Sequence, residues 1–317
     1  MGSSYDSVWV PTLWGAFLSS YEGVLEQAWG NPLTAEITDV GEFVKAIDLG
    51  TVGAVRQFSG PRQATKPRVY ALTQQNVPWE ISMEIDVEDV NRDKLGMFET
   101  KAKEMGAKFA DHPTKLIIAD LLANPTSFDG TAFFGTHPVG TTTIVNDVTN
   151  TQIPALAAGT AAAPTAVEMS NIMSQMLGYF YTFVDEAGDP INGTAREFMF
   201  VTSNPAVLAA FDSVIFSVQI TQGQTNLVKA GWEVKGWKIR ATMDPRLGSQ
   251  ANTVFYLFRT DSIVKPFIWA EEQALTLQYL GDGSDSAVKN NKYFWGTKAV
   301  RSVGVGRWQH CIRATLS

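Results

Sequence analysis

Between residues 80 and 88, apolar and polar side chains alternate without a break. The apolar members are Ile81, Met83, Ile85 and Val87, and the polar members are Glu80, Ser82, Glu84, Asp86 and Glu88. Because successive side chains of a strand point to opposite faces, this period of two predicts a strand with one buried face.

After this strand the apolar spacing changes to three and four, which places the apolar side chains on one face of a helix. These side chains are Leu95, Phe98, Ala102, Met105, Phe109, Leu116, Ile117 and Leu121. The pattern runs for about 30 residues and stops at Asn124-Pro125, where proline cannot continue a helix. We expect a spine helix on the order of 45 Å long.

Several residues bear on the ends and the continuity of this helix. Asp89 or Asn91 is expected to cap its start. Pro113 lies inside the pattern and is expected to kink or break the helix near residue 111. Gly96 and Gly106 each cost about 1 kcal/mol relative to alanine, so packing against other elements must support the helix.

Residues 54–79 combine positive charge with turn-forming dipeptides. The cations are Arg56, Arg62, Lys66 and Arg68, and the segment contains no Asp or Glu. A strand at 69–73 followed by the alternating strand predicts a long hairpin. Because a two-stranded ribbon is marginal on its own, we expect it to lie on an acidic partner. The alternative is a solvated hairpin with scattered cations.

Residues 1–46 are predicted to form an arm with one short amphipathic helix and an unusual aromatic content. Its large apolar side chains are Trp9, Trp14, Phe17, Tyr21, Leu25 and Trp29. Two interpretations stay open. The rings cover the core of their own domain, or they pack on a neighbouring subunit, since aromatic residues are enriched in interface cores.

The second half of the chain mixes helices and strands, which predicts an α+β fold. Residues 140–164 are rich in Gly, Thr and Ala and are predicted to be a long surface loop. Thr165 and Glu168 form a capping box before a helix that reaches Phe183. Further elements are a buried strand at 197–202, a helix from Asn204-Pro205, and strands at 234–242, 253–259, 274–280 and 293–315.

Composition limits the classes of protein. The 317 residues carry a formal charge of −7 and no basic run, so the chain is not built to grip nucleic acid. Cys311 is the only cysteine, which excludes an internal disulfide and fits a reducing cytoplasm. No apolar run approaches the roughly 20 residues that span a bilayer, and no signal peptide is recognisable. A soluble intracellular protein is expected.

Candidate chemistry is scarce. His112, His137 and His310 stand alone, without a second ligand at metal spacing, and are interpreted as structural. One acidic cluster precedes the spine helix: Asp86, Glu88, Asp89 and Asp93. Such a cluster could bind a divalent cation in a metal-dependent hydrolase. Strand-face and helix-start positions explain the same acids without a metal. No cofactor is expected.

The order of parts resembles the major head protein of tailed phages with the HK97-type fold, and more narrowly the Mu-like phage major head subunit family. The resemblance is carried by the stretches Ile85–Gly96, Ala110–Pro113 with Leu121-Leu122, Phe128–Phe134 with His137-Pro138, and Trp295–Gln309. It covers most of residues 40–140 and about the last 25, whereas residues 140–290 match only in layout. The Trp-rich N-terminus has no place in the family pattern.

The resemblance implies a non-enzymatic subunit that self-assembles into hexamers and pentamers of an icosahedral shell around double-stranded DNA. It implies an arm at 1–46, an extended loop at 47–90, a peripheral domain at 91–137 and 262–317, and an axial domain at 138–261. The basic loop would then be an assembly interface. A cellular nanocompartment shell protein of the same fold is an alternative.

The same resemblance implies partners and a location. The expected partners are other copies of the chain, portal and scaffold proteins, enclosed DNA bound without sequence preference, and a decoration protein, but no membrane. The expected location is the virion capsid, after assembly in the host cytoplasm. We further expect the turn that contains Asp129, Gly130, Phe133, Phe134 and His137 to be structural, with both rings packed beneath the spine.

Overall fold

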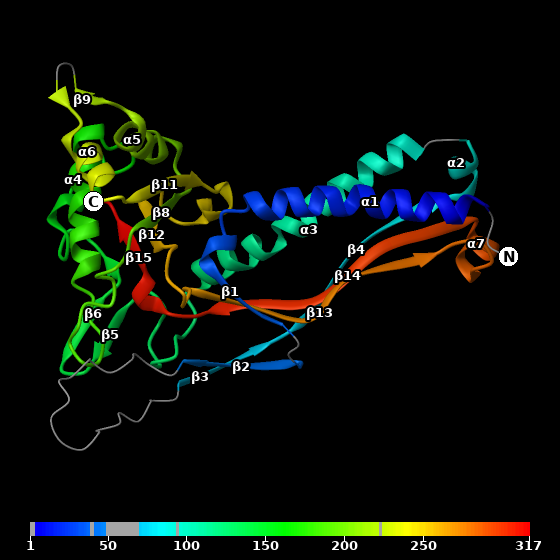
Figure 1. Cartoon of the computed structure of the whole chain (residues 1–317), viewed down its shortest axis with the longest axis horizontal. Coiled ribbons are helices and arrows are strands. Elements are labelled where there is room, and N and C mark those ends of the chain that lie inside the picture. The colour runs from blue at the N-terminus through cyan, green and yellow to red at the C-terminus, as the bar shows by residue number, and fades with distance from the viewer. Residues whose placement is uncertain (1–3, 39–40, 49–69, 93–94, 222–223) are drawn as a thin grey trace.

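The computed structural model describes residues 4–38, 41–48, 70–92, 95–221 and 224–317. Figure 1 shows an elongated molecule, with a compact end that holds the C-terminus and a long extension that ends near the N-terminus. Helices and strands occur in both parts, so the expected α+β class is confirmed.

The extension is built on a four-stranded sheet with the order β1-β13-β14-β4. Its strands are β1 (Thr34–Thr38), β13 (Phe267–Leu280), β14 (Lys292–Val305) and β4 (Val77–Asp86). β1 is parallel to β13, and the other two pairs are antiparallel. The alternating stretch is therefore a strand, as predicted, although it begins three residues earlier and ends two residues earlier than expected.

The spine helix is α3, Leu95–Ala123, and a separate short helix, α2 (Val87–Asn91), precedes it. The expected cap is wrong, because Asp89 and Asn91 both lie inside α2. α3 runs without interruption through Pro113, so the expected break does not occur.

A buried arginine explains why proline is tolerated. Pro113 has no N–H to donate to the carbonyl of Phe109, four residues earlier. Arg301 of β14 donates from Nη2 to that carbonyl oxygen at 2.7 Å. Its guanidinium lies over the Phe109 ring, 4.2 Å from the centroid, and only 1% of the residue is exposed. The side chain therefore replaces the backbone donor that the helix lacks.

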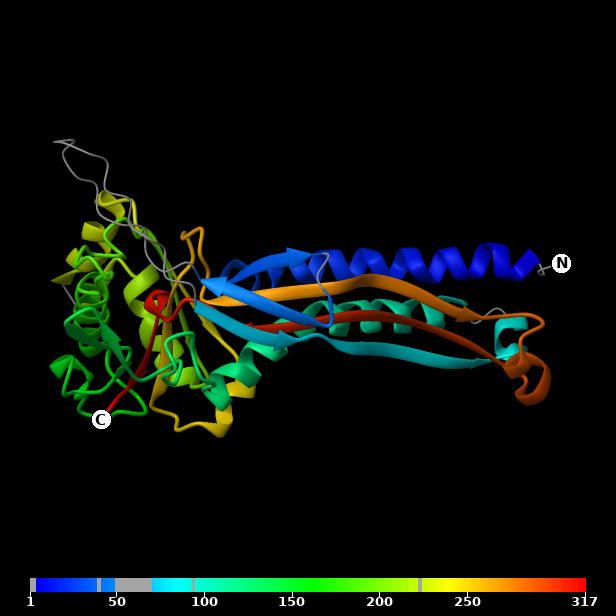
Figure 2. The ribbon, with the colours of Figure 1, turned by 90° about the horizontal axis from the view of Figure 1, so that it is seen from below.

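The N-terminal helix α1 spans Ser4–Gln27, longer than predicted, with Pro11 inside it. Figures 1 and 2 show α1 and α3 running side by side along one face of the four-stranded sheet. Trp9 and Phe17 are buried there, and the Phe17 ring meets Trp295 edge-on at 5.8 Å. These two rings therefore cover the core of their own subunit, which is the first of the two interpretations.

Gly106 lets the two helices approach closely. A Cβ atom at this position would overlap the backbone carbonyl of Phe17 in α1 and come within 3.2 Å of the Tyr21 nitrogen. Because these are backbone atoms, a side chain at 106 would have to displace the whole helix. The glycine that weakens α3 in isolation is thus the residue that allows α1 to pack against it.

We expect Gly106→Ala to lower the free energy of unfolding even though alanine is the better helix former. The gain in helix propensity is about 1 kcal/mol, whereas overpacking typically costs about 1–3 kcal/mol or more. Gly96→Ala is the matched control, because a Cβ at 96 meets nothing within 4 Å. Urea unfolding followed by circular dichroism should give opposite signs for the two variants; stabilisation by both would refute the close approach.

The compact end contains a five-stranded sheet with the order β11-β8-β12-β15-β7. Its strands are β11 (Lys238–Met243), β8 (Glu197–Thr202), β12 (Val254–Arg259), β15 (Cys311–Thr315) and β7 (Asp147–Val148). The helices of this end are α4 (Ala166–Tyr181), α5 (Pro205–Phe216) and α6 (Leu227–Val234). The predicted capping box at Thr165 and Glu168 is present.

Short elements complete the described chain. They are η1 (Asn31–Leu33), β2 (Phe43–Asp48), β3 (Tyr70–Gln75), β5 (Thr136–Val139), β6 (Thr142–Val145), η2 (Pro154–Leu156), β9 (Gln219–Thr221), β10 (Gln224–Thr225), η3 (Pro245–Ser249), α7 (Asp285–Asn290) and η4 (Trp308–His310).

Three predictions for the second half need correction. Residues 140–164 are not simply a surface loop, because Val148, Ile153 and Leu156 are fully buried in the core of the compact end. The strand expected from 234 begins at Lys238, because α6 occupies the preceding residues. The stretch 293–315 forms two strands in different sheets, β14 and β15, separated by η4.

Candidate functional site

The four loop cations proposed from the sequence, Arg56, Arg62, Lys66 and Arg68, lie outside the described residues. The base of that loop is described. β2 and β3 form an antiparallel pair, from Phe43↔Gln75 to Asp48↔Tyr70. The predicted hairpin of 69–73 with the alternating strand is therefore wrong, because β4 pairs with β14 instead.

Polar contacts fix the base of this β2–β3 hairpin to β14. Ser302 donates from Oγ to Asn76 Oδ1 at 2.6 Å, and Gln74 donates from Nε2 to Ser302 Oγ at 2.7 Å. Asn76 is buried and also donates to the carbonyl of Gly41 at 2.9 Å. The hairpin base is thus anchored to the rigid sheet, and sequence analysis gave no sign of these polar partners.

The turn after the spine is held by Asp129. Its Oδ1 accepts hydrogen bonds from the Thr131 nitrogen at 3.1 Å and from the Thr131 hydroxyl at 2.8 Å, and Oδ2 lies 2.6 Å from His137 Nδ1. Burial acts to raise the pKa of Asp129, but hydrogen bonds from His137 and Thr131 outweigh it and hold the pKa below its usual value. Gly130 has a φ of 82°, a conformation that favours glycine.

The two phenylalanines of the turn are buried. Phe133 is 0% exposed, with its ring 5.0 Å from that of Phe134 and 5.6 Å from that of Phe267. Asn124, at the end of α3, accepts from the Phe134 nitrogen at 2.7 Å and donates to the Phe134 carbonyl at 3.0 Å. The turn is therefore tied to the end of the spine through one side chain.

His137 lies deeper in the same turn. Its ring stacks on Trp308, with 3.8 Å between centroids and 9° between planes. Asn146 Oδ1 is 3.3 Å from His137 Nε2 and accepts from the Gly135 nitrogen at 2.8 Å. Asn146 also donates to the carbonyl of Phe133. A buried asparagine thus connects the turn to the C-terminal segment, a partner that sequence reasoning missed.

The other histidines and the cysteine are buried groups without a catalytic arrangement. Burial lowers the pKa of His310 to about 3, and burial together with Arg301 lowers that of His112 to about 4. Burial raises the pKa of the Cys311 thiol, which donates to the carbonyl of Trp308. Buried neutral rings and a protonated thiol are typical of packing rather than of nucleophilic catalysis.

The acidic cluster does not form a metal site in the structure. Asp86 ends β4, Glu88 pairs with Arg92 on the surface at 3.0 Å, and Asp93 lies outside the described residues. Among the described residues, no three His, Cys, Asp or Glu side chains are grouped so that they could hold a metal ion. The metal-dependent hydrolase hypothesis gains no support.

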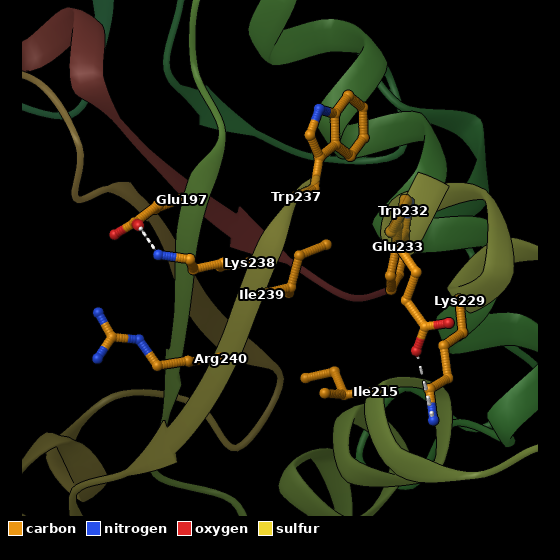
Figure 3. Close-up of a pocket in the computed structure, with 9 residues that line it drawn as sticks. All are labelled: Glu197, Ile215, Lys229, Trp232, Glu233, Trp237, Lys238, Ile239 and Arg240. Carbon is orange, nitrogen blue, oxygen red and sulfur yellow. Dashed lines mark hydrogen bonds and ion pairs between the residues drawn. The ribbon is translucent and has the colours of Figure 1, made fainter. Parts of the chain in front are cut away.

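One groove of about 430 Å³ lies beside β11, the edge strand of the compact end. Figure 3 shows Lys238 and Arg240 on one side of β11 and Ile239 on the other, toward Ile215 and α6. Lys238 pairs with Glu197 at 2.7 Å. The residues that line the groove include no serine, cysteine or histidine, so it offers no nucleophile for catalysis.

A cluster of charges connects the two ends of the molecule. Arg246 in η3 contacts Asp111 of the spine at 2.5 and 3.1 Å and Asp244 at 2.6 and 2.9 Å. Trp29 donates from Nε1 to Asp244 Oδ2 at 3.0 Å. Both carboxylates raise the pKa of the arginine further above its usual value. This clamp joins the spine, the segment after α1 and the compact end.

No described helix has both the length and the apolar character that crossing a membrane requires.

Comparison with known families decides the classification. The family model for the Mu-like prophage major head subunit gpT matches residues 47–163 and 162–316, which is most of the chain. The chain belongs to this family. It is therefore a phage major capsid protein, a structural component of the virion capsid and not an enzyme. Comparison with curated proteins finds no significant match.

Solved structures with the same fold are capsids. A chain of the procapsid of bacteriophage JBD30 is 16% identical, with a TM-score of 0.54 over 97% of this chain and 75% of that one. A chain of the mature capsid of bacteriophage PhiM1 is 12% identical, with a TM-score of 0.56 over 92% and 87%. A chain of the native GTA particle capsid is 10% identical, with a TM-score of 0.54 over 91% and 89%. The capsid head subunit thus has the HK97-type fold.

Proposed function

We propose that the head subunit assembles with copies of itself into hexamers and pentamers of an icosahedral shell that encloses double-stranded DNA. The observation that carries this proposal is the arrangement of an elongated spine and sheet, a compact end and an anchored hairpin in one chain of this family. A net charge of −7 suits a container that holds DNA without binding it tightly.

Each part has a proposed place in the shell. The compact end is the axial domain, and residues 311–317 belong with it because β15 pairs with β12. The spine and the four-stranded sheet form the peripheral domain, and the β2–β3 hairpin carries the extended loop. Four apolar side chains around α5, β9 and α6 are more than two-thirds exposed and suit contacts around a capsomer axis: Phe216, Val218, Leu227 and Val234.

The turn that contains Asp129, Gly130, Phe133, Phe134 and His137 is proposed to be structural. Portal, scaffold and decoration proteins are further proposed partners, and assembly is proposed to occur in the host cytoplasm. Electron microscopy of the purified, concentrated subunit tests self-assembly directly. Closed shells or capsomer rings are expected. A monomer at every concentration and salt condition would contradict the proposal.

The basic loop is proposed to serve assembly rather than folding of the subunit. Replacing residues 51–68 by a short Gly-Ser linker keeps β2 and β3 and removes all four cations. Circular dichroism should show an unchanged fold, because the described cores contain none of these residues. Sedimentation should show failed shell formation. Loss of the folded signal, or normal shells at normal rates, would each refute this role.

A further inference from the structure

β4 has an open edge. In the described part of the chain it pairs only with β14, so the outer N–H and C=O groups of a ten-residue strand face no partner strand. An unpaired edge of this length is a template for another extended segment. A soluble subunit gains if a specific partner covers it.

A groove of about 450 Å³ runs between this edge and α3. Ile81 and Met83 of β4 and Phe98 and Met105 of α3 contribute its apolar lining. Ile81, Met83 and Phe98 are only partly buried although they pack on the core of the extension. The groove therefore exposes apolar surface next to an unpaired backbone, which is what an added strand with alternating side chains would cover.

The outward face of the same strand is acidic. Glu80, Glu84 and Asp86 are exposed, and β4 contains no lysine or arginine. The cations nearest in register are Lys292, which pairs with Glu84 at 2.9 Å, and Lys298, opposite Glu80. On the helix side of the groove, Lys101 pairs with Glu104 at 2.8 Å, and Lys108 also lines the rim. The edge itself thus carries three carboxylates and one internal ion pair.

The chain contains a segment of opposite charge. Residues 49–69 hold four cations and no acid, together with apolar residues such as Val52, Val55 and Phe58. This combination matches an edge that offers carboxylates on its outer face and an apolar groove beside it. Electrostatic complementarity of this kind sets the register and the association rate of an interface.

The segment cannot reach this surface on its own subunit. β3 and β4 follow one another along the long axis (Figure 2), so Ile85 lies about 50 Å beyond Tyr70 at roughly 3.3 Å per residue. A 21-residue segment that leaves and returns to the hairpin base extends at most about 35 Å. The partner must be another copy.

We propose that residues 49–69 of a second copy lie along the open edge of β4, with their cations against Glu80, Glu84 and Asp86. The inference rests on the proposed function, because it names the surface that receives the loop in the shell. It assigns the acidic partner to a defined strand and explains why a long open edge is retained on the extension.

Charge exchange tests the assignment. Glu80→Arg with Asp86→Arg, and separately Arg62→Glu with Arg68→Glu, should each slow assembly several-fold at low ionic strength and less at high salt. The four substitutions together should recover most of the rate. Glu36→Arg with Glu272→Arg is the matched control, since both residues are exposed on β1 and β13 of the same sheet. The proposal is overturned if the β4 variant assembles like the wild type or if the combination gives no recovery.

A disulfide test does not depend on closed shells. A Ser82→Cys copy mixed with an Arg62→Cys copy should give an intermolecular disulfide under mild oxidation, and the native Cys311 does not compete because it is buried. A Val167→Cys copy is the control on an exposed site of α4. If disulfides form without shells, the shell proposal fails and this contact stands. If shells form without the Ser82 disulfide, the contact fails alone.

Discussion

Phe133→Ala is expected to lower the free energy of unfolding of the head subunit by about 3–5 kcal/mol. The ring is 0% exposed and packs on Phe134 and Phe267, which come from the turn and from β13. Removing it leaves a cavity where the end of the spine, the turn and the long sheet strand meet. Chemical denaturation of the unassembled subunit, followed by circular dichroism, measures the loss.

Phe133→Leu is the matched control for this substitution, because it keeps most of the volume and should cost less than about 1.5 kcal/mol. A loss below 1 kcal/mol for the alanine variant would mean that the site collapses around the missing ring. The turn would then be a compliant connection and not a structural element.

Asp120→Asn is expected to produce the largest pH-dependent change in stability. The Asp120 carboxyl lies on the spine, and its buried Oδ2 has no hydrogen-bond partner. Burial raises its pKa to about 7. Between pH 4 and pH 7 the unfolded chain is ionised at this residue while the folded chain keeps the proton, so wild-type stability falls as pH rises. Asparagine carries no charge at any pH and removes this loss.

The difference in unfolding free energy between Asp120→Asn and the wild type should therefore grow by on the order of 3 kcal/mol from pH 4 to pH 7.5 and then level off. Asp285→Asn, at a carboxyl that is 90% exposed, is the control and should show a much smaller trend. Thermal or urea unfolding across this pH range provides the measurement. A difference that does not vary with pH would show that Asp120 is solvated in the folded subunit.

Local patterns predicted the elements that depend on neighbouring residues. The period of two identified β4, the spacing of three and four identified α3, and Thr165 with Glu168 identified the start of α4. Each of these signals is contained within one segment, where side-chain direction follows directly from backbone geometry. The Gly130 conformation and the burial of both turn phenylalanines are local features of the same kind.

Long-range partners could not be read from these patterns. The strand at 70–75 pairs with β2 rather than with β4, because alternation identifies a strand but not its neighbour. The break expected at Pro113 is absent because Arg301, 192 positions away, supplies the missing donor. The Arg246 clamp likewise joins residues that only the folded chain brings together.

The position of β15 has a consequence for synthesis. This strand lies between β12 and β7, yet it is formed by some of the last residues made. At about 5–20 residues per second, a finished β12 waits several seconds on the ribosome for its neighbour. The axial sheet of a nascent chain therefore cannot close, and a chain that has not been released cannot present a completed subunit to its neighbours. Assembly competence would then be conferred only on full-length chains, and premature termination within the last few codons would leave a subunit that the shell does not incorporate.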